Sequence, residues 1–368
     1  MSDVQQRVQQ AIDGLVESGT ERGMQVAVYR RGEQVVDAVA GVADPATGRR
    51  VAADTVFYNF SIVKGAAATI AHRLVEGGRF GYDTPVVELW PEFGAHGKEG
   101  ATVRHVLTHT VGVPGIPADT TPEDLCDWDK MCAAIADAEL WWQPGTKVGY
   151  HAYTFGYLVG EVVRRTTGTP ISQVLREDVA GPLGVADELW FGMPASEHHR
   201  LARLEDAPGA ADMDLSAMPP DLPMFKAAPM TLLPTAQLGN RTDILEADIP
   251  AGGKTSARAI ARMYAALVGE VDGIRLLPPQ RLREATAVSA SGVDQVFGMP
   301  SAWGLGYSIG LLGSTAQDTP TAFGVGGAGG SFAYGDTATG TAFALTKNRL
   351  TNDFTAATQL SQLVTGAL

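Results

Sequence analysis

The fold turns on residues 57–65, Phe57-Tyr58-Asn59-Phe60-Ser61-Ile62-Val63-Lys64-Gly65. A nearly unbroken apolar run follows Ser61, continues to Val75, and is closed by Gly77-Gly78. Apolar residues on most sides of a helical period predict a buried helix, and the two glycines are a stop signal. Lys64 falls in the first turn of this helix, although a lysine is rarely buried without a partner.

The spacing of Ser61 and Lys64 predicts a reactive pair. Residues three apart share one face of a helix. Burial lowers the pKa of a lysine, and a neutral amine one turn from a serine hydroxyl can accept its proton. The helix N-terminus adds positive potential where an oxyanion would form. A simpler interpretation stays open, in which Ser61 caps the helix and Lys64 extends to its edge.

The composition excludes several classes of protein. Hydrophobic residues make up 45% of the 368 residues and charged residues 19%, which is typical of a globular protein. With 28 Lys and Arg against 41 Asp and Glu, the net charge is −13, and no basic cluster interrupts it, so neither nucleic acid nor a membrane is an expected partner.

The N-terminal residues, the lengths of the apolar runs and the cysteines indicate the expected compartment and cofactors. The first residues lack the apolar stretch of a signal peptide, and no run of about 18 apolar residues could span a bilayer. We therefore expect a cytoplasmic protein. Cys126 and Cys132 fit neither a disulfide framework nor a zinc site, so no metal or other cofactor is expected.

In the first two thirds of the chain, the predicted secondary structure changes at about residue 81, from a helix and strands to short helices. Helical spacing covers residues 3–18, and strand-like runs at 24–29 and 34–40 predict a hairpin. Short helices broken by proline and glycine are expected from 81 to 250. Within that range, residues 208–250 are rich in proline and methionine, which suits a segment that covers a pocket.

Strands return in the last third. A helix is expected to open at Lys254-Thr255-Ser256, and residues 303–311 alternate strictly between large apolar side chains and glycine or serine, which predicts one continuous strand. Strands at both ends of the chain indicate an α+β fold. Residues 1–80 and 251–368 would form an α/β lobe with one antiparallel sheet flanked by helices, and residues 81–250 an inserted, mainly helical lobe.

An acyl-transfer site also needs a second proton carrier and two N–H groups that bind an oxyanion. Tyr150, in a turn that leads into a helix, is the candidate carrier. Ser61 can supply one N–H group, and the glycine-rich segment from Gly324 to Ser331 is the candidate for the other.

The candidate oxyanion and substrate-binding set also includes Val325, His151 and Trp142. His109 and His151 invite a triad interpretation, although hydrogen-bonded structural roles suit both. Trp141 and Trp142 precede Pro144 and would either line the mouth of a pocket or pack in the core.

Taken in chain order, Ser61-Ile62-Val63-Lys64, Tyr150 and the glycine-rich strand near 325 resemble the serine β-lactamase and penicillin-binding-protein superfamily. The resemblance is closest to its class C-like branch, the family VIII carboxylesterases and related transacylases. The segments that resemble this branch are Trp90-Pro91-Glu92-Phe93, Thr102 to His109 with Gly112-Val113-Pro114, and Gly149-Tyr150-His151-Ala152.

This resemblance implies a β-lactamase/transpeptidase-like fold and a role for each site residue. Ser61 would be the acylated nucleophile, Lys64 its base, and Tyr150 the residue that moves protons to the leaving group and the acceptor. The implied oxyanion donors are the N–H groups of Ser61 and Ala328, the latter beside Gly327.

Two positions depart from the lactamase pattern. Ala152 stands where the pattern Tyr-x-Asn has asparagine, and Val325-Gly326-Gly327 stands where lactamases carry Lys-Thr-Gly. The missing polar side chains disfavour β-lactam and peptidoglycan substrates. The backbone donors need no side chain and are unaffected.

We therefore expect a serine esterase that forms an acyl-enzyme on small neutral carboxylic esters. A biosynthetic transacylase, which passes the acyl group from its donor to an amine or alcohol, is the alternative, since the chemistry is shared up to the acyl-enzyme. A second alternative is a non-catalytic binding or scaffold protein on the same fold, motivated by the altered residue at 325.

Overall fold

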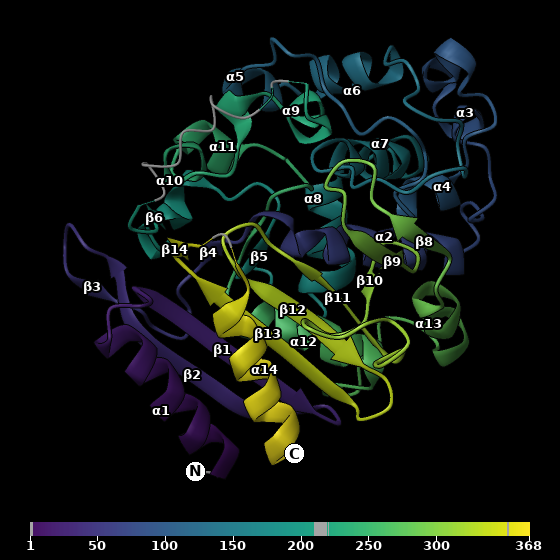
Figure 1. Cartoon of the computed structure of the whole chain (residues 1–368). Coiled ribbons are helices and arrows are strands. Elements are labelled where there is room, and N and C mark those ends of the chain that lie inside the picture. Colours follow the sequence, from purple (N-terminus) through teal and green to yellow (C-terminus); the bar gives the residue numbers. More distant parts are fainter. Residues whose placement is uncertain (1–2, 210–218, 220, 352) are drawn as a thin grey trace.

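One large sheet and a helical lobe make up the computed structural model, which describes residues 3–209, 219, 221–351 and 353–368 (Figure 1). The sheet has nine strands in the order β3-β2-β1-β13-β12-β11-β10-β9-β8, and each neighbouring pair is antiparallel. Its strands are β1 (Gly23–Arg30), β2 (Glu33–Asp44), β3 (Arg49–Arg50), β8 (Ala290–Val293), β9 (Pro300–Trp303), β10 (Ser308–Ile309), β11 (Ala322–Gly326), β12 (Phe332–Asp336) and β13 (Thr341–Lys347).

Helices cover both faces of this sheet. Along β1, Val26 and Val28 join the core under α1 (Asp3–Glu17) and α14 (Thr355–Ala367). The alternate residues Ala27 and Tyr29 join the opposite core, where α2 (Lys64–Glu76) and α12 (Ala257–Val268) pack. Strand side chains alternate between faces, so a strand covered on both faces is apolar throughout.

The helical lobe is built around α7 (Thr154–Thr167), whose first ten residues are all buried and which packs on α2. Around it lie the short helices α3 (Val86–Leu89), α4 (Val103–Leu107), α5 (Pro122–Leu125), α6 (Trp128–Ala136), α8 (Ile171–Val174), α9 (Pro223–Ala227), α10 (Ala236–Gly239) and α11 (Thr242–Glu246). Of the proline- and methionine-rich segment, Met213, Met218 and Pro220 lie outside the described residues. Its pocket-covering role stays a prediction.

A small second sheet delivers the chain to Ser61. β4 (Phe57–Tyr58) and β5 (Leu189–Trp190) both pair antiparallel with β7 (Lys254–Thr255). The expectation that Lys254-Thr255 opens a helix is therefore wrong. Only Ser256 acts as the helix cap, because its Oγ accepts from the N–H of Ala259 at 3.2 Å.

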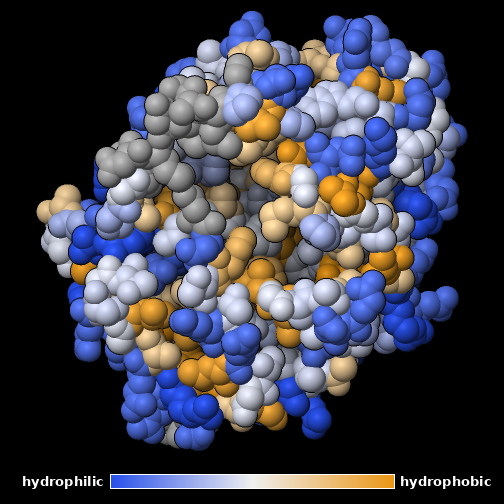
Figure 2. All heavy atoms as spheres, in the orientation of Figure 1, coloured by the Kyte–Doolittle hydropathy of each residue, from blue (hydrophilic) through white to orange (hydrophobic). Residues whose placement is uncertain are grey.

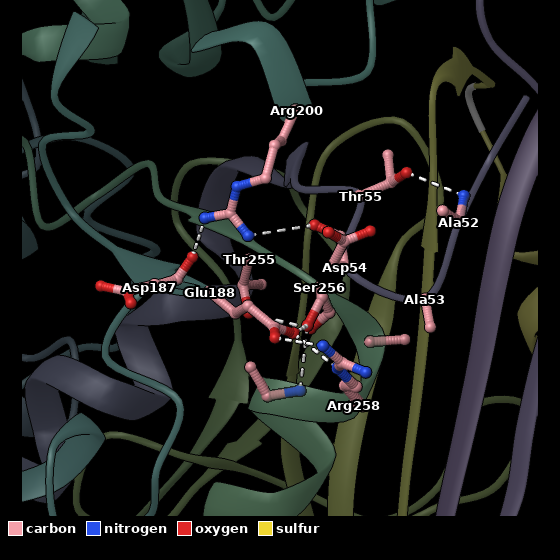
Figure 3. A network of polar contacts seen from close by, with 12 residues as sticks. Ala52, Ala53, Asp54, Thr55, Asp187, Glu188, Arg200, Thr255, Ser256 and Arg258 are labelled. Atoms are coloured by element: carbon pink, nitrogen blue, oxygen red, sulfur yellow. Dashed lines mark hydrogen bonds and ion pairs between the residues drawn. The ribbon is translucent and has the colours of Figure 1, made fainter. Parts of the chain in front are cut away.

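A polar network fixes this small sheet (Figure 3). The carboxylate of Glu188, next to β5, accepts from Ser256 Oγ at 2.6 Å and from Arg258 Nε at 2.7 Å, which ties β5 to the start of α12. Arg200 donates to the carbonyl oxygens of Asp187 and Asp54, so the segment before β4 is held by the same network. The position of Ser61 thus depends on residues far away in the sequence.

The predicted strand at 303–311 is wrong as one continuous strand. The structure has β9 ending at Trp303 and β10 covering only Ser308–Ile309. Between them Gly306 has φ +86°, and its N–H binds the carbonyl oxygen of Leu107 instead of a neighbouring strand. Gly306 thus belongs to a turn, where its lack of a side chain permits the positive φ.

Three other expectations concern the fold class, the first helix and hairpin, and the division into lobes. The α+β class is confirmed, as are the first helix and the hairpin of β1 and β2. The division into 1–80 with 251–368 and 81–250 stays a prediction. In the described part of the chain, no helix is both long and apolar enough to cross a membrane.

Candidate active site

Ser61 lies in a tight turn directly before α2. Phe60–Val63 forms one turn of 3₁₀ helix, and Phe60 before the serine has φ +49°, a strained value for a residue other than glycine. Asn59 supports the turn, since its amide donates to the carbonyl oxygens of Phe57 and Thr255, both at 3.0 Å. The turn leaves Ser61 partly exposed between buried neighbours.

Ser61 and Lys64 are in direct contact. Lys64 Nζ lies 2.7 Å from Ser61 Oγ and 3.3 Å from the carbonyl oxygen of Ala251. Side chains three residues apart are eclipsed in a 3₁₀ turn, which brings the two groups together. No side chain caps α2, so the interpretation of Ser61 as a helix cap is excluded.

The environment of Lys64 makes its amine a base. The side chain is buried, and among the described residues no carboxylate forms an ion pair with it. Burial lowers the pKa of Lys64 to about 7. A large fraction of the amine is therefore neutral near pH 7 and can accept the serine proton.

Tyr150 reaches the same serine from the other lobe. Its phenol lies near the Ser61 side chain, which acts on the pKa of Tyr150, and Lys64 Nζ lies 5.0 Å from the centroid of the Tyr150 ring. Burial, with a smaller contribution from the charge of Asp294, raises the pKa of Tyr150. The phenol is thus protonated at neutral pH and can pass a proton on without serving as the primary base.

The glycine-rich segment after β11 lies against the nucleophile turn. A Cβ on Gly327 would come within 2.1 Å of the carbonyl oxygen of Asn59, so only glycine allows this approach. Ser331 Oγ donates to Asn59 Oδ1 at 2.9 Å and holds the two segments together. In the described chain the N–H groups of Ser61 and Ala328 bind no other group, which leaves both for an oxyanion.

His151 and Trp142 are not placed for substrate contact. The His151 ring is fully buried, and its nitrogens bind the N–H of Val113 at 3.1 Å and the carbonyl oxygen of Gly149 at 2.6 Å. Trp142 is buried, and its Nε1 donates to the carbonyl oxygen of Thr110 at 3.1 Å. Structural roles account for both residues.

A second buried lysine lies behind the site. Lys254 on β7 is fully buried and donates to the carbonyl oxygens of Phe191 at 2.6 Å and Ile244 at 2.9 Å. Its ammonium lies 5.0 Å from the centroid of the Tyr58 ring. Burial lowers its pKa to about 7, as for Lys64, but its bonds are to backbone only.

Apolar side chains surround the approach to Tyr150. The loop between β8 and β9 carries Phe297 and Met299, which are 49% and 67% exposed, and the Phe297 ring centroid lies 5.9 Å from that of Tyr150. Figure 2 shows a hollow near the centre of the face seen in Figure 1, between the sheet and the helical lobe, with apolar residues at its rim. Within the described chain, no group of three or more His, Cys, Asp or Glu side chains could hold a metal ion.

Sequence reasoning missed three contributors to this site. Asn59 and Asp294 each bind backbone groups of segments distant in sequence, and Ala251 contributes only its carbonyl oxygen. No spacing or motif signals such contacts. Only the position of Asn59, two residues before Ser61, could have suggested that its side chain supports the serine.

The fold and the comparisons with known proteins define an enzyme of the serine hydrolase and acyltransferase class. The family model for β-lactamases matches residues 8–365, and the chain belongs to that family. The non-catalytic scaffold is therefore set aside.

Individual relatives agree with this assignment. The chain is similar to the esterase/β-lactamase LipL of Mycobacterium tuberculosis, with 36% identity over 89% of this chain and 77% of the relative. A family VIII carboxylesterase structure superposes with a TM-score of 0.90 at 31% identity, covering 100% of this chain and 98% of that one. A penicillin-binding protein homologue from Caulobacter crescentus gives a TM-score of 0.87 at 33% identity, covering 100% of this chain and 98% of its own.

Proposed function

We propose that this protein is a serine carboxylesterase that forms an acyl-enzyme at Ser61. The observation that carries the proposal is the 2.7 Å contact between Ser61 Oγ and a buried Lys64 amine whose pKa is about 7. The names of two relatives, an esterase/β-lactamase and a family VIII carboxylesterase, support the same reaction class.

Acylation proceeds by addition and elimination at the ester carbonyl. Lys64 accepts the proton of Ser61 Oγ, and the oxygen attacks the carbonyl carbon, whose oxygen becomes an oxyanion held by the N–H groups of Ser61 and Ala328. The bond to the alcohol oxygen then breaks. Tyr150 gives its phenolic proton to the departing oxygen and regains one from the Lys64 ammonium.

Water completes the cycle in the esterase. It attacks the acyl-enzyme carbonyl, gives one proton to the Tyr150–Lys64 pair, and releases the carboxylic acid as Ser61 Oγ is reprotonated. An amine or alcohol that replaces the water yields an amide or ester instead. This transacylase is the second candidate function, favoured by the apolar Val325 and by the exposed Phe297 and Met299, which would exclude water from the site.

The substrate class follows from the side chains that are present. Val325 on β11 is buried and apolar, and Ala152 offers no amide, so neither position binds a carboxylate or a β-lactam side chain. Phe297 offers apolar surface beside Tyr150, and the exposed Met299 lies in the same loop. We therefore propose small, neutral, apolar carboxylic esters as substrates, with no nucleic acid partner.

Intact-protein mass spectrometry tests the proposal. The enzyme is mixed with 4-nitrophenyl esters of short acids, with and without an added amine, beside the variants Ser61→Ala and Ser308→Ala. Ser308 lies on β10 and is the matched control. We expect an acyl adduct on the wild type and on Ser308→Ala only, and loss of that adduct in water identifies the esterase.

Two results would count against the proposal. Loss of the adduct only when amine is present would favour the transacylase. Absence of any adduct, or an adduct that persists in Ser61→Ala, would remove Ser61 as the nucleophile.

A further inference from the structure

Three consecutive backbone N–H groups around Tyr150 are bound by only two residues. The N–H of Gly149 donates to the carbonyl oxygen of His109 at 3.0 Å. The N–H of Tyr150 donates to Asp294 Oδ2 at 2.8 Å, and that of His151 donates to His109 Nδ1 at 3.1 Å. His109 and Asp294 therefore hold the backbone on both sides of the tyrosine and at the tyrosine itself.

Asp294 connects Tyr150 to the loop between β8 and β9. Its second oxygen, Oδ1, accepts from the N–H groups of Val296 at 2.8 Å and Phe297 at 2.9 Å, and the side chain is only 5% exposed. A buried carboxylate that accepts three N–H bonds is well stabilised without a cation. The same loop returns a bond, since the N–H of Gln295 donates to the carbonyl oxygen of Val148 at 2.9 Å.

His109 is suited to hold the backbone of His151 in place, and not to transfer protons. Because Nδ1 accepts from the N–H of His151, the ring proton lies on Nε2, and burial keeps the pKa of His109 well below its usual range. The ring is fully buried, stacks on Phe155 with centroids 4.8 Å apart, and lies 4.9 Å from the Tyr150 ring. Its backbone has φ +57°, which asparagine and glycine tolerate better than other residues.

We propose that Asp294 and His109 are positioning residues for Tyr150, which fix its phenol against Ser61 so that it can protonate the leaving alcohol. This inference rests on the proposed esterase function. Neither residue touches the reacting atoms. Their contribution acts through the backbone of residues 149–151, so it matters only in steps that need the Tyr150 proton.

Leaving-group dependence separates positioning from a merely structural role. A nitrophenolate departs without protonation, whereas an alkoxide requires a proton as the bond breaks. If Tyr150 is displaced, hydrolysis of an ethyl ester must slow more than hydrolysis of the 4-nitrophenyl ester of the same acid. Partial unfolding would lower both rates by one factor.

The test compares kcat/KM on ethyl and 4-nitrophenyl butyrate for the wild type, Asp294→Asn and Asp336→Asn. Asp336 is the matched control, an aspartate in the hairpin of β12 and β13 that accepts from the N–H of Ala338 at 3.1 Å. In Asp294→Asn an NH₂ group replaces one acceptor, so we expect about a 10-fold or larger loss on the ethyl ester and about a 3-fold or smaller loss on the nitrophenyl ester. Asp336→Asn should leave the ratio of the two rates unchanged.

His109 provides an independent pair of variants. In His109→Asn the side-chain oxygen can replace Nδ1 as acceptor, whereas His109→Gly removes it, and both tolerate the backbone angle. We expect the glycine variant to lose ethyl ester activity selectively and the asparagine variant to retain the wild-type ratio. Equal losses on both esters in Asp294→Asn and His109→Gly would overturn the proposal.

Tyr150→Phe distinguishes failure of this inference from failure of the proposed function. If it shows strong leaving-group selectivity and Asp294→Asn shows none, the tyrosine is the proton donor and the positioning inference is wrong. If Tyr150→Phe itself shows no selectivity, the proposed role of Tyr150 is wrong and the positioning inference falls with it.

Discussion

At the scale of single residues, the chemistry depends on the protonation state of Lys64. Its amine has a pKa of about 7 because it is buried. Below that pH it is protonated and cannot accept the proton of Ser61. We therefore expect kcat/KM on a 4-nitrophenyl ester to rise as pH increases through about 7 and then to level off.

Lys254 is the matched control for this pH profile, because burial gives it a pKa of about 7 as well. Lys254→Met should leave the midpoint of the rise unchanged, since Lys254 binds only backbone carbonyls. A shift of the midpoint in that variant would show that Lys64 is not the group that titrates.

Removal of the base gives a second prediction at this scale. Lys64→Ala should lower the rate of acylation by about 100-fold or more, because Ser61 loses its general base. Stopped-flow release of nitrophenol measures acylation directly. A rate within a few-fold of wild type would assign the base to another group.

Site residues that are close in the sequence could be predicted from it, whereas residues that meet only through folding could not. Ser61 and Lys64 are three residues apart, so helical geometry alone brought them together. Asp294 is 144 residues from Tyr150, and its bond to the Tyr150 N–H depends on how two lobes pack. The Tyr150 role came from a family resemblance, because the residue has no local signal of its own.

At the scale of elements, we expect activity to depend on how the segment after β11 lies against the turn that carries Ser61. In Gly327→Ala the added Cβ would lie 2.1 Å from the carbonyl oxygen of Asn59, so the segment must move away from Ser61. We expect kcat to fall by about 100-fold, as for loss of an oxyanion donor. Gly14→Ala in α1, where a Cβ meets nothing within 4 Å, should leave kcat unchanged.

Steady-state kinetics and thermal melting on both glycine variants check this prediction. A Gly327→Ala enzyme with normal kcat would mean that the segment after β11 does not supply an oxyanion donor. If the melting temperature falls but kcat does not change, the segment likewise supplies no oxyanion donor.

Element boundaries were predicted where one face of the element is polar. The first helix and β2 have such faces, whereas β1 is buried along almost its whole length and its end is marked by the polar turn from Arg30 to Glu33. Residues 303–311 have no such face, because the glycines between the large apolar residues are buried too. Periodicity therefore could not distinguish a strand from a turn whose glycines take positive φ.

At the scale of the whole molecule, one hydrophobic core lies on the sheet face away from the candidate catalytic residues. Ile12 on α1 is fully buried in the core with α14, on the sheet face away from α2. Ile12→Ala should lower the free energy of unfolding by about 2–5 kcal/mol and leave kcat/KM unchanged. Urea unfolding and ester hydrolysis at low temperature measure the two quantities, and a parallel loss of both would contradict this separation.

The overall α+β fold was predictable because its strands come from both ends of the chain, around a middle rich in short helices. The small sheet of β4, β7 and β5 was not. Its strands have only two residues each and join three distant segments. Two-residue strands carry no periodic signal.

Lys64 and Lys254, two of the four buried lysines among the described residues, affect how the stability of the fold depends on pH. In the folded protein their amines release protons at a pKa of about 7, whereas lysines of an unfolded chain stay protonated up to about 10.4. Between these values the unfolded chain binds more protons, so the folded state gains stability as pH rises. Urea midpoints at about pH 7 and about pH 9.5 should therefore differ more for the wild type than for Lys254→Met. Burial of these two amines thus contributes stability that grows as pH rises from about 7 to about 10.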